Sequence, residues 1–169
     1  MKLISIFLFA ILASTVALTQ SDPIETFKVH KFACDTGTTT LEITFCVGNK
    51  LKFADSLLNN IYKKIIKSID KSIIESKKEL SVRQTKKNSS NEDKTEIQTL
   101  LKEIDKHQRL KQSIIKSQKE WIKLRDMNSD VISISCEDGR ECNALTILAE
   151  IDDTLERIKK IVTFYDVSD

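Results

Sequence analysis

Three segments of this sequence carry apolar residues at steps of three and four, the spacing of one helix face. The steps are most regular in the last segment, from Ala144 to Tyr165. Three Gly and one Pro in 169 residues are too few for a turn-rich β-sandwich or for a glycine-rich phosphate-binding loop. We therefore predict an all-α protein whose three main helices cover residues 39–79, 93–127 and 141–164.

The start of the first predicted helix carries a local signal. Thr39 and Glu42 stand three residues apart, as the two partners of a capping box do. Leu41 and Phe45 are expected to begin the apolar stripe of this helix, which continues from Leu51 in steps of three and four. The sequence therefore predicts a helix that starts next to Thr39.

The segments between the helices are polar or contain helix breakers. Residues 18–38 are expected to form an irregular lead-in, because Pro23 interrupts them. Residues 86–93 contain no apolar side chain and are expected to form a loop. The run Asn128-Ser129-Asp130 is expected to end the second helix, and residues 131–135 are then extended or a loop.

The first residues resemble a secretory signal peptide. Residues 3–12 are an unbroken apolar run, and Thr15 and Ala17 are small residues at the two positions that signal peptidase reads. Ten residues of helix span about 15 Å, which is half of the roughly 30 Å core of a bilayer, so a cleaved signal is favoured over an anchor. We expect residues 1–17 to be removed and the mature chain to be soluble, without a transmembrane segment, in the periplasm or secreted.

An even number of cysteines in an exported chain indicates two disulfides. No Cys-x-x-Cys pair is present and the two histidines are isolated, so we expect no metal and no cofactor. In an antiparallel bundle with short connections, all four cysteines would lie at one pole. Local pairing is preferred and cross-pairing stays open; the four residues are Cys34, Cys46, Cys136 and Cys142.

Two sets of polar residues lie at helical spacing on the first and second predicted helices. Antiparallel packing would bring Asp55 near Arg125, whose planar fork suits a carboxylate. The residues offer no nucleophile with a base, so we interpret them as a network that fixes helix register, with no catalytic residue. The six residues are Asp55, Asn59, Tyr62, Gln118, Trp121 and Arg125.

Two segments that contain these polar residues resemble the LprI-type lysozyme inhibitor family. After Cys34, a Thr-x-x-Glu-like helix start and Cys46, the segment 54–62 (ADSLLNNIY) is similar to the family's A-D-x-x-L-N-x-x-Y. The segment 117–126 (SQKEWIKLRD) is similar to the family's A-Q-x-x-W-I-x-x-R-D. The resemblance implies a helical domain over residues 39–166 in a small envelope or secreted protein that binds lysozyme.

The sequence departs from this family pattern at Ser129, where the family usually has a cysteine. Cys136 is a candidate to replace it, and the family's disulfide connectivity is therefore left open. The usual Ala before Gln118 is Ser117 here, and the polar segment between the two motifs is longer than expected.

The charge of the chain is unevenly distributed. A net charge of +2 gives no argument for nucleic acid binding, yet residues 137–169 contain nine acidic and four basic residues. Glu137, Asp138 and Glu141 surround the predicted cysteine pole and are our candidate partner-binding residues, although a solvated face would look the same.

The sequence indicates a binding protein and not an enzyme. The first hypothesis is an exported inhibitor that occludes lysozyme, and the alternative is a non-inhibitory structural or adaptor module of the cell envelope. The partner and the oligomeric state are open at this point.

Overall fold

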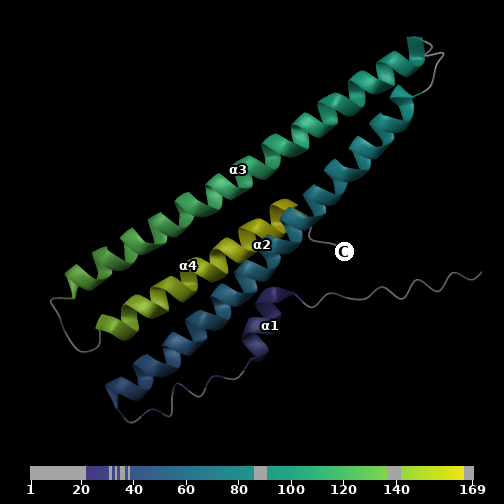
Figure 1. Ribbon diagram of the computed structural model, residues 1–169. Coiled ribbons are helices and arrows are strands. Elements are labelled where there is room, and N and C mark those ends of the chain that lie inside the picture. The colour runs from purple at the N-terminus through teal and green to yellow at the C-terminus, as the bar shows by residue number, and fades with distance from the viewer. Residues whose placement is uncertain are drawn as a thin grey trace, which may run out of the picture.

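The structure is a computed structural model that describes residues 22–30, 32, 34, 37, 39–85, 91–136 and 142–165. These residues form helices and short connections and contain no strand, which confirms the predicted all-α fold (Figure 1). The proposed signal peptide at 1–17 lies outside the described residues. The four helices are α1 (Pro23–Val29), α2 (Thr40–Gln84), α3 (Asn91–Ser135) and α4 (Cys142–Tyr165).

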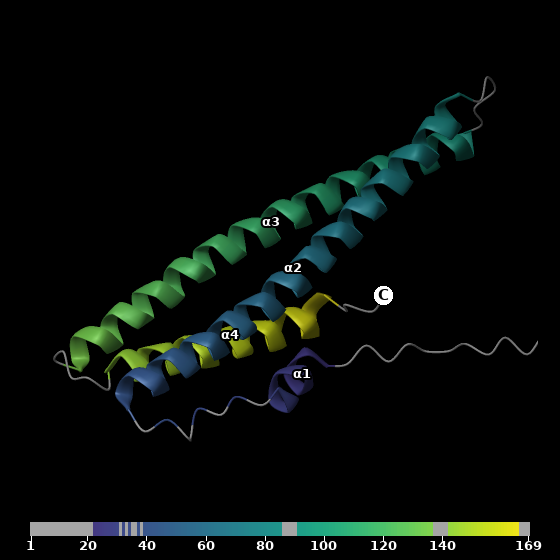
Figure 2. The same ribbon diagram turned by 60° about the horizontal axis from the view of Figure 1, so that its bottom comes forward.

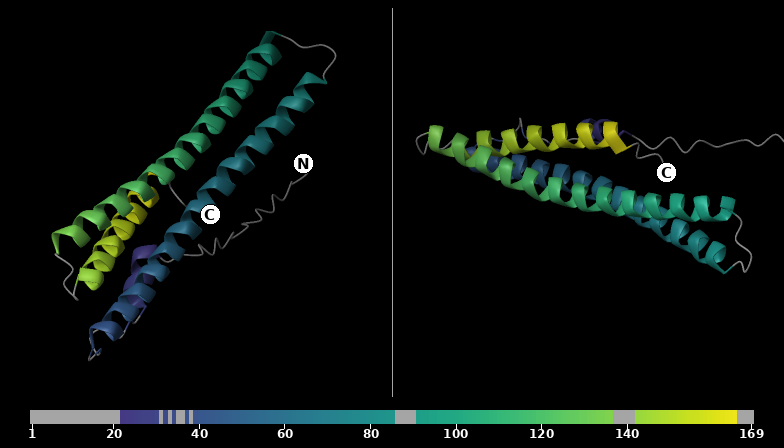
Figure 3. Two further views of the ribbon diagram at one scale, coloured as in Figure 1. Left: turned by 60° about the vertical axis from the view of Figure 1, so that its left-hand side comes forward. Right: turned by 90° about the horizontal axis from the view of Figure 1, so that it is seen from above.

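Helices α2, α3 and α4 pack antiparallel in sequence order, as predicted. Three ion pairs connect α2 with α3, and equal steps forward along α2 correspond to nearly equal steps back along α3. Seen from above, α4 lies along one side of the α2–α3 pair (Figure 3). The three ion pairs are Asp55–Arg125, Asp70–Lys111 and Arg83–Glu96.

The core is built from the apolar stripes of these helices. The predicted α2 stripe is buried in steps of three and four, and α4 contributes Ile158, which is completely buried. Ile114 of α3 packs into the same cluster. Residues of three helices form this cluster, so each helix buries its apolar face against the other two. The buried α2 residues are Leu58, Ile61, Ile65, Ile69 and Ile73.

The predicted start of α2 is confirmed at Thr39. The Thr39 hydroxyl accepts from the Glu42 amide at 3.2 Å, and the Glu42 carboxylate accepts from the Thr39 amide at 3.1 Å. The expectation that Leu41 and Phe45 begin the buried stripe is wrong, because both are at least 70% exposed. The step from Phe45 to Leu51 is six residues, which turns the first two side chains away from the buried face.

The prediction that the second helix ends at 128–130 is also wrong. Helix α3 continues to Ser135, and the amide of Cys136 still donates to the carbonyl of Ile132 at 3.1 Å. Asn128 donates to the Asp153 carboxylate at 3.3 Å and Ser129 donates to Glu150. These polar side chains bond to α4 instead of capping α3, so their composition gives a false stop signal.

The prediction of an irregular lead-in over 18–38 is wrong for α1. Pro23 occupies the first turn of this helix, where a proline costs nothing because that N–H needs no partner. The Asp22 side chain caps the helix by accepting from the Ile24 amide at 2.8 Å. Phe27 is buried against α2 and α4, in one cluster with Ala54 and Ile151. Figure 2 shows α1 beside α4 and α2.

Helices α2 and α3 extend well past the end of α4 (Figure 1). We call residues 70–84 of α2 and 91–111 of α3 the arm, and the rest of the bundle the head. Buried Ile73, Leu100 and Ile104 hold the arm together with only two helices. None of the helices in the described ranges has an apolar stretch of the length that a bilayer requires.

Candidate functional site

A charged pair at the centre of the head connects all three long helices. Arg125 of α3 donates through one nitrogen, Nη1, to the Asp55 carboxylate of α2 at 2.6 Å and to the Thr154 hydroxyl of α4 at 2.9 Å. The Thr154 hydroxyl donates in turn to the backbone carbonyl of Glu150 at 2.7 Å. The predicted approach of Asp55 to Arg125 is therefore present in the structure, with a third partner that the sequence analysis did not include.

Burial makes this pair structurally important. The Arg125 side chain is 13% exposed and Asp55 is 36% exposed, so the guanidinium is mostly removed from water. Its Nε is buried and finds no hydrogen-bond partner among the described residues. A buried guanidinium with an unused donor depends on its remaining bonds, so losing Asp55 or Thr154 would be costly.

Two guanidinium groups lie over the ring of Trp121. Arg125 lies over its ring at 5.1 Å from the centroid, and Arg157 of α4 lies at 5.8 Å. Arg157 also donates to the Gln118 side chain at 3.3 Å and to the Ser117 hydroxyl at 2.9 Å. Partial burial lowers the pKa of Arg157 from its ordinary value. Gln118 and Trp121 thus connect α3 to α4 through Arg157, another residue that sequence analysis missed.

The two remaining predicted network residues differ in their surroundings. Tyr62 packs on the edge of the core, and burial raises the pKa of its hydroxyl above 10.0 while Lys111 opposes that shift. Asn59 is exposed and makes no hydrogen bond to the other predicted residues in the described part of the chain. The structure therefore brings Asp55, Gln118, Trp121 and Arg125 into one polar layer, with Tyr62 at its edge and Asn59 outside it.

The position of Thr154 on the apolar stripe of α4 is the feature of the sequence that could have identified it as part of the polar layer. Thr154 lies three residues after Ile151 and four before Ile158, which places it on the buried stripe of α4. A polar residue on a buried stripe needs a partner, and Thr154 is completely buried. Arg157 carries no comparable signal, because its face of α4 is also that of exposed residues.

A crevice of about 130 Å³ lies where α4 ends. Tyr62 of α2 and Tyr165 of α4 border it together with the cations Arg157 and Lys160. Both cations already have partners within the chain, since Arg157 bonds to α3 and Lys160 pairs with Glu156 at 3.1 Å. The crevice therefore gives no specific indication of a ligand.

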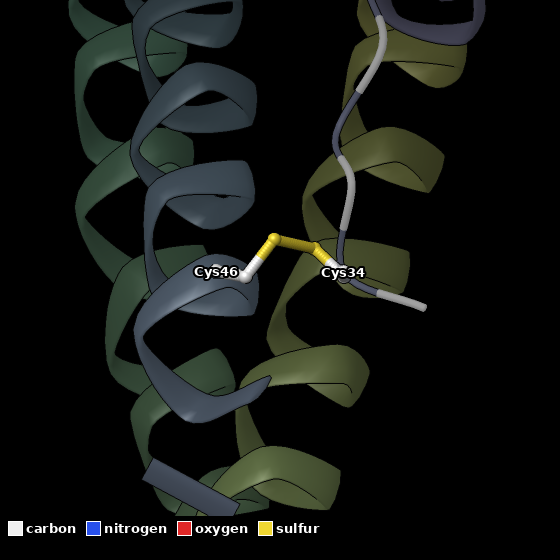
Figure 4. Close-up of a disulfide and its surroundings, with 2 residues drawn as sticks. All are labelled: Cys34 and Cys46. Carbon is white, nitrogen blue, oxygen red and sulfur yellow. A yellow bond between two sulfur atoms is a disulfide. The ribbon is translucent and has the colours of Figure 1, made fainter. Parts of the chain in front are cut away.

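The first predicted disulfide is present at the cysteine pole. Cys34 is joined to Cys46 of α2, with Cα atoms 5.3 Å apart, and this bond ties the segment after α1 to the first turns of α2 (Figure 4). The preferred local pairing is confirmed for these two cysteines.

The second predicted disulfide is not formed between the described Cys136 and Cys142. The Cys142 sulfur lies 3.3 Å from the Cys136 carbonyl oxygen. Both residues lie at the end of the head where α3 ends and α4 begins, as the predicted common pole requires (Figure 1). A bond between them stays a prediction.

The predicted partner-binding residues Glu137, Asp138 and Glu141 lie outside the described residues. Their neighbours in sequence are the end of α3 and the start of α4. In the described part of the chain, no group of three or more His, Cys, Asp or Glu residues is arranged to hold a metal ion.

A family model described as lysozyme inhibitor LprI matches residues 33–160, which contain α2, α3 and most of α4. The chain belongs to the LprI family. Comparisons with curated proteins and with solved structures found no match.

The family match and the polar layer coincide in this LprI-family chain. Both segments that resemble the family motifs face each other across α2 and α3, and the Asp55–Arg125 pair joins them. The motif residues Asp55, Gln118, Trp121 and Arg125 therefore share one place in the fold, where they hold the helices together. The family is described as one of lysozyme inhibitors.

Proposed function

We propose that this protein inhibits lysozyme by binding it one-to-one and covering its active-site cleft. The observation that carries the proposal is the match of the lysozyme inhibitor LprI family to residues 33–160. The polar layer of the bundle makes its hydrogen bonds between the helices. The outer surface of the bundle is therefore the part that we propose contacts a partner protein. Binding without turnover is the mechanism we propose.

We further propose that the protein is exported. A disulfide such as Cys34–Cys46 persists in oxidising compartments, which supports a location outside the cytoplasm. The apolar run at 3–12 and the small residues that follow it support the same conclusion. We expect cleavage after Ala17 and a periplasmic or secreted mature chain.

Charge supports the choice of the cysteine pole as the contact region. Animal lysozymes are basic proteins, and an acidic surface would steer them toward productive encounters. Glu137, Asp138 and Glu141 are the acidic residues that we propose for this role. Attraction between opposite charges on two surfaces weakens as salt screens it.

The experiment is a titration of a basic animal lysozyme with the oxidised mature protein. The rate of cell-wall lysis is the readout, and it is measured at two salt concentrations. We expect inhibition that saturates near a one-to-one ratio and weakens with salt. Reversing Glu137, Asp138 and Glu141 to Lys should abolish it. A control with the same charge change in the arm, at Glu75, Glu103 and Asp105, should inhibit as the wild type does.

Absence of inhibition by folded wild-type protein would contradict the proposal. Capture of an envelope partner from the native source, without any effect on lysozyme, would instead support a structural or adaptor module. If the variant with Glu137, Asp138 and Glu141 reversed to Lys inhibits as strongly as the wild type, the inhibitory function stands. The three acidic residues are then not the contact with lysozyme.

A further inference from the structure

Helix α3 exposes a continuous row of large apolar side chains near the cysteine pole. They follow one another at steps of three, four and three, so they lie on one face of the helix over about three turns. Their exposed fractions run from 55% to 78%. We call this row the α3 stripe; its members are Leu124, Met127, Val131 and Ile134.

The α3 stripe is not part of the bundle core. The side of α3 that packs inward carries buried Gln118 and, a turn or two later, Trp121 and Arg125. Neighbouring α4 contacts α3 through Asn128 and Ser129. Scattered exposed apolar residues are ordinary on a protein surface, whereas a continuous exposed row marks an interaction surface.

Carboxylates border the α3 stripe. The cations in this part of α3 are already paired, because Lys123 bonds to Glu120 at 3.0 Å and Arg125 bonds inward to Asp55. Asp130 is exposed on α3 itself, three residues after Met127 and four before Ile134, so it is a surface neighbour of both.

A further carboxylate lies on the other side of the stripe. Asn128 is a surface neighbour of Leu124 and Val131, four and three residues away, and it holds Asp153 of α4 at 3.3 Å. The surface thus has an apolar centre with acidic edges on both sides, which is the arrangement of a protein–protein interface with a charged rim.

We infer that the α3 stripe is the apolar centre of the surface that binds lysozyme, and that the carboxylates beside it form the rim. The inference rests on the proposed function and names where on the bundle the basic partner sits. Acidic edges complement a basic protein. In the sequence, the acidic residue Glu137 follows Ile134 by three residues.

The acidic edges also argue against a second copy of this chain as the occupant. In a symmetric dimer the same surface faces itself, so the carboxylates of one copy would lie against those of the other. Like charges placed opposite each other destabilise such a contact. The same edges disfavour a membrane with anionic head groups.

The test compares two double variants that each remove exposed apolar side chains without changing charge. Val131→Ser with Ile134→Ser removes half of the stripe. Ile74→Ser with Val82→Ser, which are 66% and 56% exposed in the arm, is the matched control. Binding to a basic animal lysozyme is measured as Kd and as association and dissociation rates, with circular dichroism as the check on folding.

We expect the stripe variant to bind at least about tenfold more weakly and the arm variant to bind within about twofold of wild type. The loss should come from faster dissociation, since apolar contacts at an interface centre act on the lifetime of a complex. Reversing the rim residue Asp130 to Lys should instead slow association and reduce its dependence on salt. If the first stripe variant does not fold, Leu124→Gln with Met127→Gln provides the same comparison.

The outcomes separate the inference from the proposed function. Wild-type binding with an unchanged Kd in the stripe variant would overturn the inference and leave lysozyme inhibition in place. Folded wild-type protein that does not bind lysozyme would overturn both. A wild-type dimer in sedimentation analysis that the stripe variant loses would show that a second copy covers the stripe, and the inference would fall.

Discussion

At the scale of single residues, Arg125 contributes most to the arrangement of the head. It bonds to both of the other long helices, through Asp55 and Thr154, and it also lies over Trp121. Replacing one partner of a mostly buried pair leaves the other partner without compensation for its lost hydration. Arg125 therefore fixes the register of α2, α3 and α4 relative to one another.

We predict that Arg125→Met lowers the free energy of unfolding by about 2 kcal/mol, because Asp55 and Thr154 lose their shared donor. Lys123→Met is the matched control, since the Lys123–Glu120 pair is exposed and should contribute less than about 0.5 kcal/mol. Urea denaturation of both variants measures the difference. Equal stability of the two variants would contradict a structural role for Arg125.

The Cys34–Cys46 disulfide is the second residue-scale device, and it closes a loop of 12 residues. Reducing it should destabilise the fold by about 3 kcal/mol, since the unfolded chain regains the freedom of that loop. The measurement is the melting temperature of Cys34→Ser with Cys46→Ser against wild type. An unchanged melting temperature would contradict the prediction.

A thiol count on denatured, unreduced protein tests the second predicted bridge. No reactive thiol would support a bond between Cys136 and Cys142 in the mature protein. Two reactive thiols per chain would reject the bond between Cys136 and Cys142 and agree with the Cys34–Cys46 disulfide alone.

At the scale of elements, the short helix α1 is held to the bundle by an aromatic cluster. Phe27 is 7% exposed and lies 6.1 Å from Phe53 of α2, centroid to centroid. His30 stacks on the same ring at 4.3 Å, and Phe32 lies 5.8 Å from it. A seven-residue helix is unstable by itself in water, so this packing is what keeps α1 in place.

Phe27→Ala should therefore cost about 3 kcal/mol of stability, the usual effect of emptying a buried aromatic site. Phe45→Ala is a matched control, because Phe45 is 70% exposed and its removal should change stability by less than about 0.5 kcal/mol. Thermal unfolding measures both. A Phe27 variant as stable as the Phe45 variant would show that α1 does not pack as the structure has it.

Helix α3 is the second element to consider, because the α3 stripe depends on the helix being continuous. The α3 stripe lies on one face only if the helix passes through 128–130 without a break. Ser129→Pro should cost about 3 kcal/mol or more, because proline removes a backbone donor and clashes with the preceding turn. Ser129→Ala, which loses only the bond to Glu150, should cost about 1 kcal/mol. Similar stability of the two variants in urea would indicate a loop at this point.

At the scale of the whole molecule, the protein divides into a head, in which α2, α3 and α4 pack together, and an arm, in which only α2 and α3 pack together. The head holds the Asp55–Arg125 pair, the disulfide and α1, and the arm holds Asp70–Lys111 and Arg83–Glu96. Fewer buried contacts support each turn of the arm than each turn of the head. Stability within one molecule follows such differences in local packing.

We predict that amide hydrogen exchange is faster in the arm, over 73–84 and 91–104, than in the head around Leu58, Ile114 and Ile158. Local opening of two helices exposes less apolar surface than opening of three, and so needs less free energy. Exchange followed by mass spectrometry resolves the two regions. Uniform protection along α2 and α3 would contradict the division into head and arm.

The sequence determined the presence of the three long helices, their antiparallel order and the core of the polar layer, because these follow from local periodicity and from short connections. Asp55 could be paired with Arg125 in advance because both lie on inward faces, and antiparallel packing places the first half of α2 beside the last half of α3. The tertiary structure decided the rest. Thr154 and Arg157 join the polar layer, and Asn128 continues α3, because neighbouring helices supply the partners. The α3 stripe is visible only in three dimensions, since periodicity shows that a face is apolar but not whether another helix covers it.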